Sequence, residues 1–114
     1  MRIIVHNHGA TLAADFSEIS TERLERLTRF NVPIDRIELD IRHESNPHFG
    51  KKSHRVVITT HGSGPLIRAM GEGFNDLAAF DEAAEAIELQ LRKIHERAKD
   101  FDRTTLRKFK AVNS

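Results

Sequence analysis

The chain has 114 residues, a length typical of a single domain of about 100–150 residues. Its formal net charge is +1, which excludes a uniformly basic nucleic-acid-binding coat but allows a local basic patch. It contains no cysteine, so disulfides, a thiol nucleophile and cysteine-ligated zinc are excluded. The start MRIIVHNH leads into polar residues without a long apolar run. We therefore expect no signal peptide, no membrane partner and a cytoplasmic location.

The first part of the chain predicts a strand, a helix and a second strand. Residues 2–8 are short and β-branched, as is typical of a strand. Over residues 16–30 apolar side chains recur at helical spacing, at Phe16, Ile19, Leu24, Leu27 and Phe30. Residues 34–43 alternate strictly between apolar and polar side chains, which indicates a half-buried strand.

The second part predicts a loop over residues 44–52, a strand over 53–61, a tight turn and a return strand over 66–70. The glycines of HGSGPL precede neither a G-K-[ST] motif nor a helix, so they indicate a hairpin rather than a phosphate loop. Asn75 is the predicted N-cap of a long helix, with Asp76 at the positive end of its dipole. The apolar stripe of this helix comprises Leu77, Phe80, Ala84, Ile87, Leu91, Ile94, Ala98 and Phe101.

The order strand, helix, three strands, helix predicts an α+β fold. A strand–helix–strand crossover makes the first two strands parallel, and short turns make the later pairs antiparallel. Because each helix has one apolar stripe, both helices should cover the same face of a four-stranded mixed sheet. We therefore predict a β-α-β-β-β-α two-layer sandwich over residues 1–101, followed by a helix extension or the root of a linker over residues 102–114.

Charge is sorted along the long helix. Residues 73–88 contain five acidic residues and no Lys or Arg, whereas residues 89–110 contain eight basic and three acidic residues. A helix dipole favours this order by about 0.3–1 kcal/mol per charge, but only over the first and last turns. Two interpretations stay open, a solvated charged face and an anion-binding surface.

The basic residues of this helix flank its outward face. At about 100° per residue, Arg92 and Lys99 fall on one flank, and Lys93 and Arg97 fall on the other. Leu89 is predicted to lie exposed between them. This arrangement predicts a ridge that contacts phosphates on both flanks, as a helix inside an RNA cleft would.

Two further basic clusters lie on the first predicted helix and on the loop that leads into the third strand. On the first predicted helix, arginine recurs at every third position, and neighbouring glutamates neutralise part of this positive charge. The predicted RNA-binding residues are Arg23, Arg26, Arg29, Lys51, Lys52, Arg55, Arg92, Lys93, Arg97 and Lys99. Because the chain has no Tyr or Trp to stack on bases, the composition favours structured RNA recognised by shape over a single strand.

Catalytic and metal-binding interpretations find less support in the sequence. His6 and His8 point to one face of the first strand, but no H-E-x-x-H or comparable spacing is present. No G-x-S-x-G motif occurs, and the Glu38 and Asp40 carboxylates are typical of a salt-bridged sheet surface. We predict no catalytic residue, no metal, no cofactor and no small-molecule substrate. The alternatives are a metal-dependent enzyme using His6 or His8, and a protein-interaction domain whose acidic residues 81–88 bind a basic partner.

Three segments together resemble a known family. They are RIELDIRHESN, KKSHRVVITTHGSGPLIRA and FNDLAAFDEAAEAIELQLRK. In combination they are similar to the ribosome hibernation-promoting factor family, whose relatives include the ribosome-associated inhibitor of stationary phase, and above all to its actinobacterial members. The similarity covers about residues 1–100.

The resemblance implies a fold like that of double-stranded-RNA-binding domains, and binding to ribosomal RNA between the head and body of the small ribosomal subunit. Occupying the tRNA and mRNA path there silences translation in resting or stressed cells without catalysis. The basic positions of the family map onto Arg23, Arg26, Arg29, Arg92, Lys93 and Arg97. Two departures are Ala86 and Leu89, where relatives often have Lys or Arg, and Leu77, where a tyrosine is common.

Long members of the family add a linker and a C-terminal domain that pairs two ribosomes. The resemblance implies that this chain is a short form, or the N-terminal domain of a long form. We therefore expect a monomer that does not pair ribosomes by itself.

Overall fold

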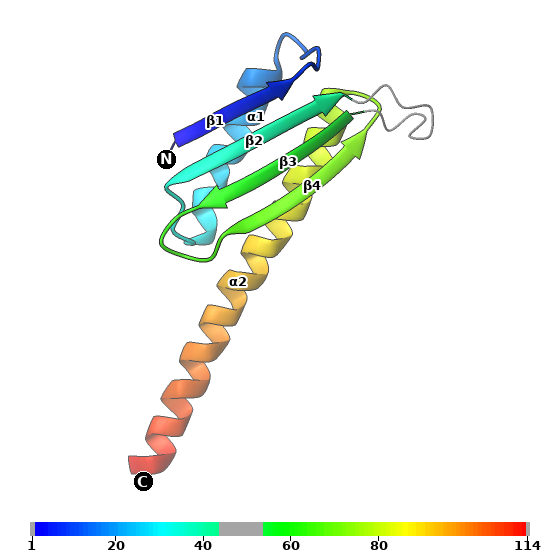
Figure 1. The fold of residues 1–114 in the computed structure, drawn as a ribbon. Helices are drawn as coiled ribbons and strands as arrows, with labels where there is room; N and C mark the ends of the chain where they lie inside the picture. Colours follow the sequence, from blue (N-terminus) through cyan, green and yellow to red (C-terminus); the bar gives the residue numbers. More distant parts are fainter. Residues whose placement is uncertain (1, 44–53, 114) are drawn as a thin grey trace.

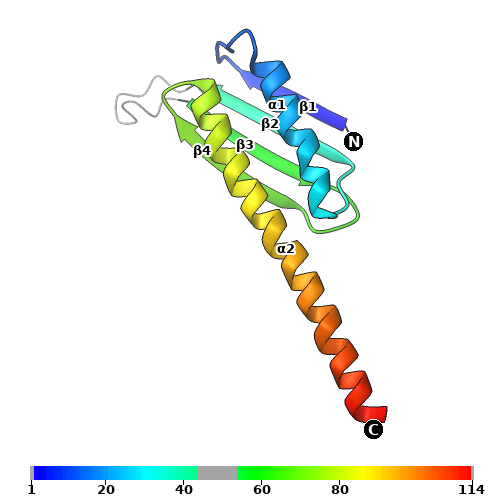
Figure 2. The same cartoon turned by 180° about the vertical axis from the view of Figure 1, so that it is seen from behind.

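The fold is a four-stranded sheet with two helices on one face (Figures 1 and 2). The computed structural model describes residues 2–43 and 54–113, with side chains in these ranges up to residue 97. The elements are β1 (Arg2–His8), α1 (Phe16–Glu25), the 3₁₀ helix η1 (Arg26–Phe30), β2 (Arg36–His43), β3 (His54–His61), β4 (Ile67–Gly73) and α2 (Asp76–Asn113). This arrangement confirms the predicted α+β sandwich.

Strand pairing follows the crossover and turn lengths of the sequence. The sheet order is β1-β2-β3-β4, with β1 parallel to β2 and the other two pairs antiparallel. On β2 the side chains of Ile37, Leu39 and Ile41 are fully buried under the helices, as the alternation predicted. This strand begins two residues later than expected. The predicted loop over residues 44–52 lies outside the described residues.

The first predicted helix consists of two parts. The α-helix ends at Glu25, and residues Arg26–Phe30 form η1, closed by Asn31 in the left-handed conformation at φ 55°. Leu24, Leu27 and Phe30 are all buried, and they lie three residues apart. A 3₁₀ helix has three residues per turn, so this spacing keeps Leu27 and Phe30 of η1 on the core side, in line with Leu24 at the end of α1.

Ile19 does not belong to the core, contrary to the prediction. Its side chain is 39% exposed, and Ser20 is buried in its place. The Ser20 hydroxyl donates a hydrogen bond of 3.2 Å to the Ser17 carbonyl, so burial leaves this polar group satisfied. The core-facing stripe of α1 therefore runs through Phe16, Ser20 and Leu24 rather than through Ile19.

The start of α2 is capped as predicted. The Asn75 Oδ1 accepts a hydrogen bond of 2.7 Å from the Ala78 amide, which satisfies one of the free N–H groups of the first turn. Asp76 is only 5% exposed, and its carboxylate accepts the Ala13 amide at 2.7 Å. This bond attaches the segment before α1 to the first turn of α2.

The apolar stripe of α2 packs on the sheet and on α1. Phe80, Ala84, Ile87 and Leu91 are buried, and the Phe80 ring meets the Phe16 ring edge to face at 5.7 Å. The helix then extends past the end of the sheet (Figure 2). The division between a domain to residue 101 and an extension or linker beyond it stays a prediction. Within the described residues, no helix has an apolar stretch long enough to cross a membrane.

Strand β4 extends to Gly73, three residues beyond the predicted end at Met70. A Cβ atom on Gly71 would lie 2.2 Å from the Ala79 carbonyl oxygen and 2.3 Å from the Ala83 amide nitrogen. The backbone of α2 therefore rests directly on β4, and only glycine leaves room for this contact.

We expect Gly71→Ala to destabilise the domain by about 1–3 kcal/mol or more, because the new methyl group would collide with the backbone of α2, which cannot rotate away as a side chain could. Urea unfolding followed by circular dichroism measures the effect. Gly64→Ala is the matched control, because its Cβ would meet nothing closer than 3.6 Å. Equal unfolding midpoints for the two variants would contradict the proposed close packing.

Candidate nucleic-acid interface

Five exposed cations from two elements gather at one end of the helix layer. We call this set the basic end; it comprises Arg26, Arg29, Arg92, Lys93 and Arg97. The helices α1 and α2 run side by side in the same direction, and η1 packs against α2 (Figure 2). Two basic clusters that are far apart in the sequence thus lie at the same end of the helix layer.

One flank of α2 faces the edge of the sheet. The Gln90 side-chain amide donates a hydrogen bond of 3.0 Å to the Arg68 carbonyl of β4, which fixes the orientation of the helix here. Lys93 and Arg97 lie on the same flank and line a shallow hollow of about 230 Å³ with Gln90 and Ile94.

The opposite flank of α2 faces α1. Glu88 is bonded to Arg23 of α1, and Arg92 follows Glu88 by one helical turn, so Arg92 lies on the α1 side. Leu89 is 48% exposed, as predicted. For Arg92, Lys93 and Arg97 the structure agrees with the two-flank arrangement read from the helical wheel.

Arg23 connects the two helices. Its guanidinium pairs with Asp81, and its Nε lies 3.2 Å from the Glu88 carboxylate. Partial burial opposes the charge, but hydrogen bonds to Glu88 and Asp81 outweigh it, so the pKa of Arg23 is raised above its ordinary value. Arg23 was predicted to contact phosphate, yet its guanidinium is occupied by two carboxylates of the same chain. It positions the helices that carry the basic end.

Arg26 and Arg29 are held more weakly. The Arg26 guanidinium lies 2.8 Å from the Glu22 carboxylate, one turn earlier, and both side chains are exposed. Such a pair contributes only about 0.3–0.5 kcal/mol, so a phosphate can replace the glutamate at little cost. The Arg29 guanidinium stacks 4.8 Å from the centre of the Phe30 ring, which keeps it close to the surface of η1.

The basic end does not include the remaining predicted RNA-binding residues. Arg55 extends from β3 on the face of the sheet opposite the helices, where it lies 3.2 Å from Glu72. Lys51, Lys52 and the side chain of Lys99 lie outside the described residues. The structure therefore brings together two of the three predicted clusters.

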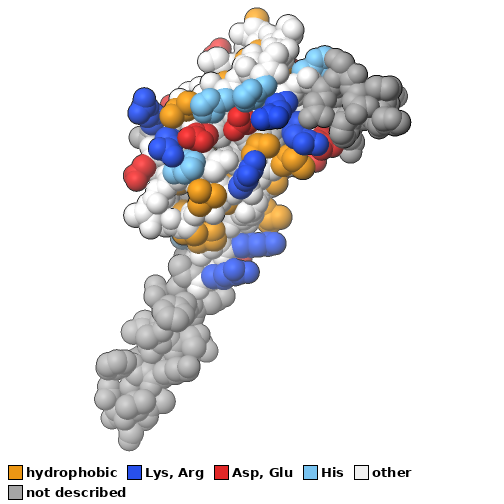
Figure 3. Space-filling model, in the orientation of Figure 1, with side chains coloured by type: hydrophobic (Ala, Val, Ile, Leu, Met, Phe, Trp, Pro, Cys, Tyr) orange, Lys and Arg blue, Asp and Glu red, His pale blue; other side chains and the backbone are white. Residues whose placement is uncertain are grey.

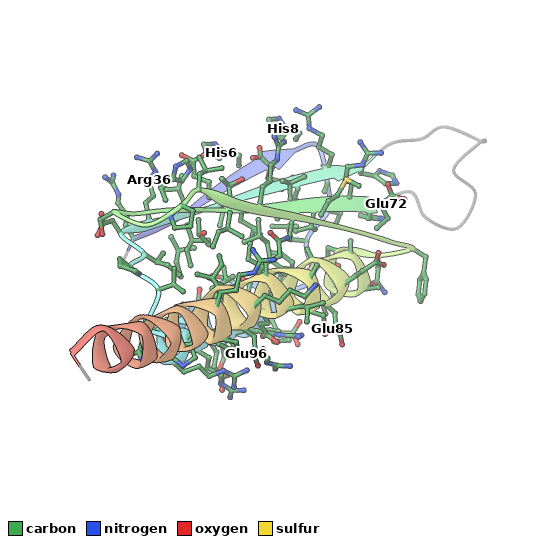
Figure 4. The ribbon with its side chains drawn as sticks, turned by 90° about the horizontal axis from the view of Figure 1, so that it is seen from below. His6, His8, Arg36, Glu72, Glu85 and Glu96 are labelled. Carbon is green, nitrogen blue, oxygen red and sulfur yellow. The ribbon has the colours of Figure 1, made fainter. Side chains whose placement is uncertain are left out.

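The histidines and carboxylates of the sheet form paired contacts. The His8 Nε2 lies 3.1 Å from the Asp40 carboxylate, and the Arg36 Nε lies 3.3 Å from that of Glu38. His6, His8 and Arg36 point away from the helices (Figure 4). Among the described residues, no three His, Asp or Glu side chains come together as metal ligands would. The predicted salt-bridged sheet surface at Glu38 and Asp40 is confirmed.

His43 and His54 form a second histidine contact, at the end of β2 and the start of β3. Their rings stack with centroids 4.4 Å apart. Burial lowers the pKa of His54, and the neighbouring His43 lowers it further, while Asp76 and the backbone of Phe74 oppose these effects. His54 is therefore more easily protonated in the unfolded chain than in the folded domain.

Comparison with known proteins places this arrangement in a family. Residues 3–99 match the family described as sigma 54 modulation protein / S30EA ribosomal protein, and the chain belongs to that family. The ribosome hibernation promotion factor of Mycobacterium tuberculosis is 29% identical over 97 residues. These residues make up 85% of this chain and 44% of that protein, so the chain spans less than half the length of this relative.

Two solved structures share the fold. The Thermus thermophilus Protein Y N-terminal domain superposes with a TM-score of 0.63 at 22% identity, over 82% of this chain and 94% of that one. A ribosomal subunit interface protein from Coxiella burnetii gives a TM-score of 0.60 at 17% identity, over 88% of this chain and 99% of that one.

We expect acid to destabilise the domain through His54. The pKa of His54 is lower in the folded domain than in the unfolded chain, where it is near 6.5. The neutral imidazole therefore contributes to the free energy of unfolding in full above pH 6.5, and this contribution is lost as the pH falls below that value. In His54→Gln, unfolding free energy measured in urea should fall less steeply between about pH 7 and pH 5. The control is His6→Gln, on the exposed edge strand; an identical pH profile for both variants would contradict the assignment.

Proposed function

We propose that this chain is a ribosome-associated factor that binds ribosomal RNA of the small subunit through the basic end and lowers translation in resting or stressed cells. The observation that carries the proposal is the gathering of five exposed cations on two neighbouring elements of a chain whose net charge is only +1. Binding needs no reaction, no metal and no cofactor. The family to which the chain belongs supports this class of function.

The geometry of the basic end suits a structured RNA. Arg92 lies on the α1 flank of α2, whereas Lys93 and Arg97 lie on the β4 flank. Phosphates on both sides of the helix can therefore be contacted at once, as they would be if α2 entered a groove between RNA segments. A flat anionic surface would engage one flank only.

The acidic half of α2 sets the orientation of binding. Asp81, Glu82 and Glu85 are exposed in the N-terminal half of the helix, and Glu85 projects away from the sheet (Figure 4). These carboxylates repel phosphates, while the cations of the basic end attract them. We infer that the C-terminal part of the helix layer meets RNA and that the N-terminal part stays outside it.

The similar proteins support the choice of partner. One relative is named a ribosome hibernation promotion factor, and one structure of the same fold is titled a ribosomal subunit interface protein. We infer a cytoplasmic protein that occupies the tRNA and mRNA path of the small subunit as a monomer. A subunit occupied in this way is closed to initiation.

Replacing Arg92 and Arg97 by Ala removes one cation from each flank of α2. Binding to purified small subunits, measured by co-sedimentation from about 50 to 200 mM salt, should weaken, and the slope of log K against log salt should become shallower by about one unit per lost phosphate contact. Translation of a reporter in a cell-free extract should then be inhibited less.

Arg2 and Arg36 provide the matched control, because replacing them by Ala removes the same two charges from the opposite face of the sheet. This variant should bind like the unmodified chain. Equal loss of binding in both variants would show that net charge, rather than the basic end, carries the interaction. Binding that survives ribonuclease treatment of the subunits would favour a protein partner for residues 81–88.

A further inference from the structure

The face of the sheet opposite the helices is covered by no other element of the described chain (Figure 1). It contains a hollow of about 270 Å³, which we call the open-face hollow. The hollow is lined by Asp40, Arg42, Arg55, Val57, Arg68 and Met70, from strands β2, β3 and β4. In Figure 3 basic and hydrophobic side chains lie next to one another on this face.

The floor of the hollow is apolar. Val57 and Met70 are direct partners across β3 and β4, and Met70 is 49% exposed. A methionine side chain is unbranched and polarisable, so it adapts its shape to an apolar group placed against it. Methionine and arginine are also enriched where proteins contact one another.

The rim of the hollow has excess positive charge. In the part of the chain that the structure describes, neither Arg42 nor Arg68 has an ion-pair partner, and both are exposed. Arg42 lies directly opposite Arg55 on the neighbouring strand. Like charges at such a position destabilise a sheet, and Glu72 already pairs with Arg55, so the stability of the fold does not account for Arg42. The arrangement does provide guanidinium groups that can bind carboxylates in two-pronged geometry.

The carboxylates of this face argue against RNA as the ligand. Asp40 lies in the wall of the hollow, and Glu72 is paired with Arg55 beside it. A continuous row of phosphates would meet these acids at close range, and the lining offers no aromatic ring on which a base could stack. A protein segment needs only one or two carboxylates beside its apolar side chain, and these can pair with Arg42 and Arg68 instead of following a continuous row past Asp40 and Glu72.

We propose that the open-face hollow docks a segment of another protein, in which an apolar side chain flanked by Asp or Glu packs on Met70 and Val57. The carboxylates bind Arg42 and Arg68. The proposal does not depend on the proposed function, because the hollow and the basic end lie on opposite layers of the domain.

Selection of a phage-displayed random dodecapeptide library on the immobilised chain tests this proposal. We expect enriched peptides with acidic residues around a leucine, methionine or aromatic residue. A synthetic copy of the leading peptide should bind at least about tenfold more weakly to Arg68→Glu and to Met70→Glu than to the unmodified chain. Arg2→Glu, on the same face but at the β1 edge, and the variant with Ala at positions 92 and 97 should bind it unchanged.

Chemical-shift mapping of the same peptide on the unmodified chain keeps the test independent of any folding defect in the variants. Shifts at Val57, Arg68 and Met70 support the proposal. The proposal would be overturned by a selection that enriches no peptide, by shifts confined to other residues, or by Arg68→Glu and Met70→Glu variants that bind the peptide as tightly as the unmodified chain does. It would also be overturned if a single-stranded RNA dodecamer, rather than the peptide, shifted the hollow residues.

Discussion

The close contact between the backbone of α2 and strand β4 is the constraint on which the rest of the structure depends. At Gly71 the helix lies so near the strand that a single methyl group would collide with the Ala79 carbonyl. This contact sets the height and direction of α2 above the sheet, and Ala79 and Ala83 are fully buried as a result. With α2 fixed, α1 can pack beside it through the Phe16 and Phe80 rings.

The charge pattern of α2 has a structural part and a functional part. In the acidic half, Asp81 and Glu88 bind Arg23 and so attach α1 to α2. In the basic half, no described acid pairs with Arg92, Lys93 or Arg97, so these cations remain available to an external anion. The helix dipole explains neither part, because both extend beyond the terminal turns. A nearly neutral protein can thus present one strongly basic end.

The sequence predicted the fold well because hydrophobic periodicity and turn chemistry are local signals. It missed what depends on tertiary contacts. Nothing near Arg23 in the sequence indicates that carboxylates 58 and 65 residues away occupy it. Strand β4 was predicted too short because glycine is a poor strand residue. Gly71 is needed in this strand only because the backbone of α2 packs against it, and that contact is not visible in the sequence. The change to a 3₁₀ helix at Arg26 was not predicted, because the three-residue spacing of Leu24, Leu27 and Phe30 fits an α-helix as well as a 3₁₀ helix.

The central claim is that the basic end meets the RNA of the small ribosomal subunit. Electron cryo-microscopy of purified small subunits mixed with the chain tests it most directly. The account predicts density for the domain with α2 between RNA segments, Arg92 and Arg97 beside phosphates, and the open face of the sheet turned away from RNA. A map in which the sheet contacts the RNA and the basic end faces solvent, or in which the domain does not occupy the subunit at all, would contradict it.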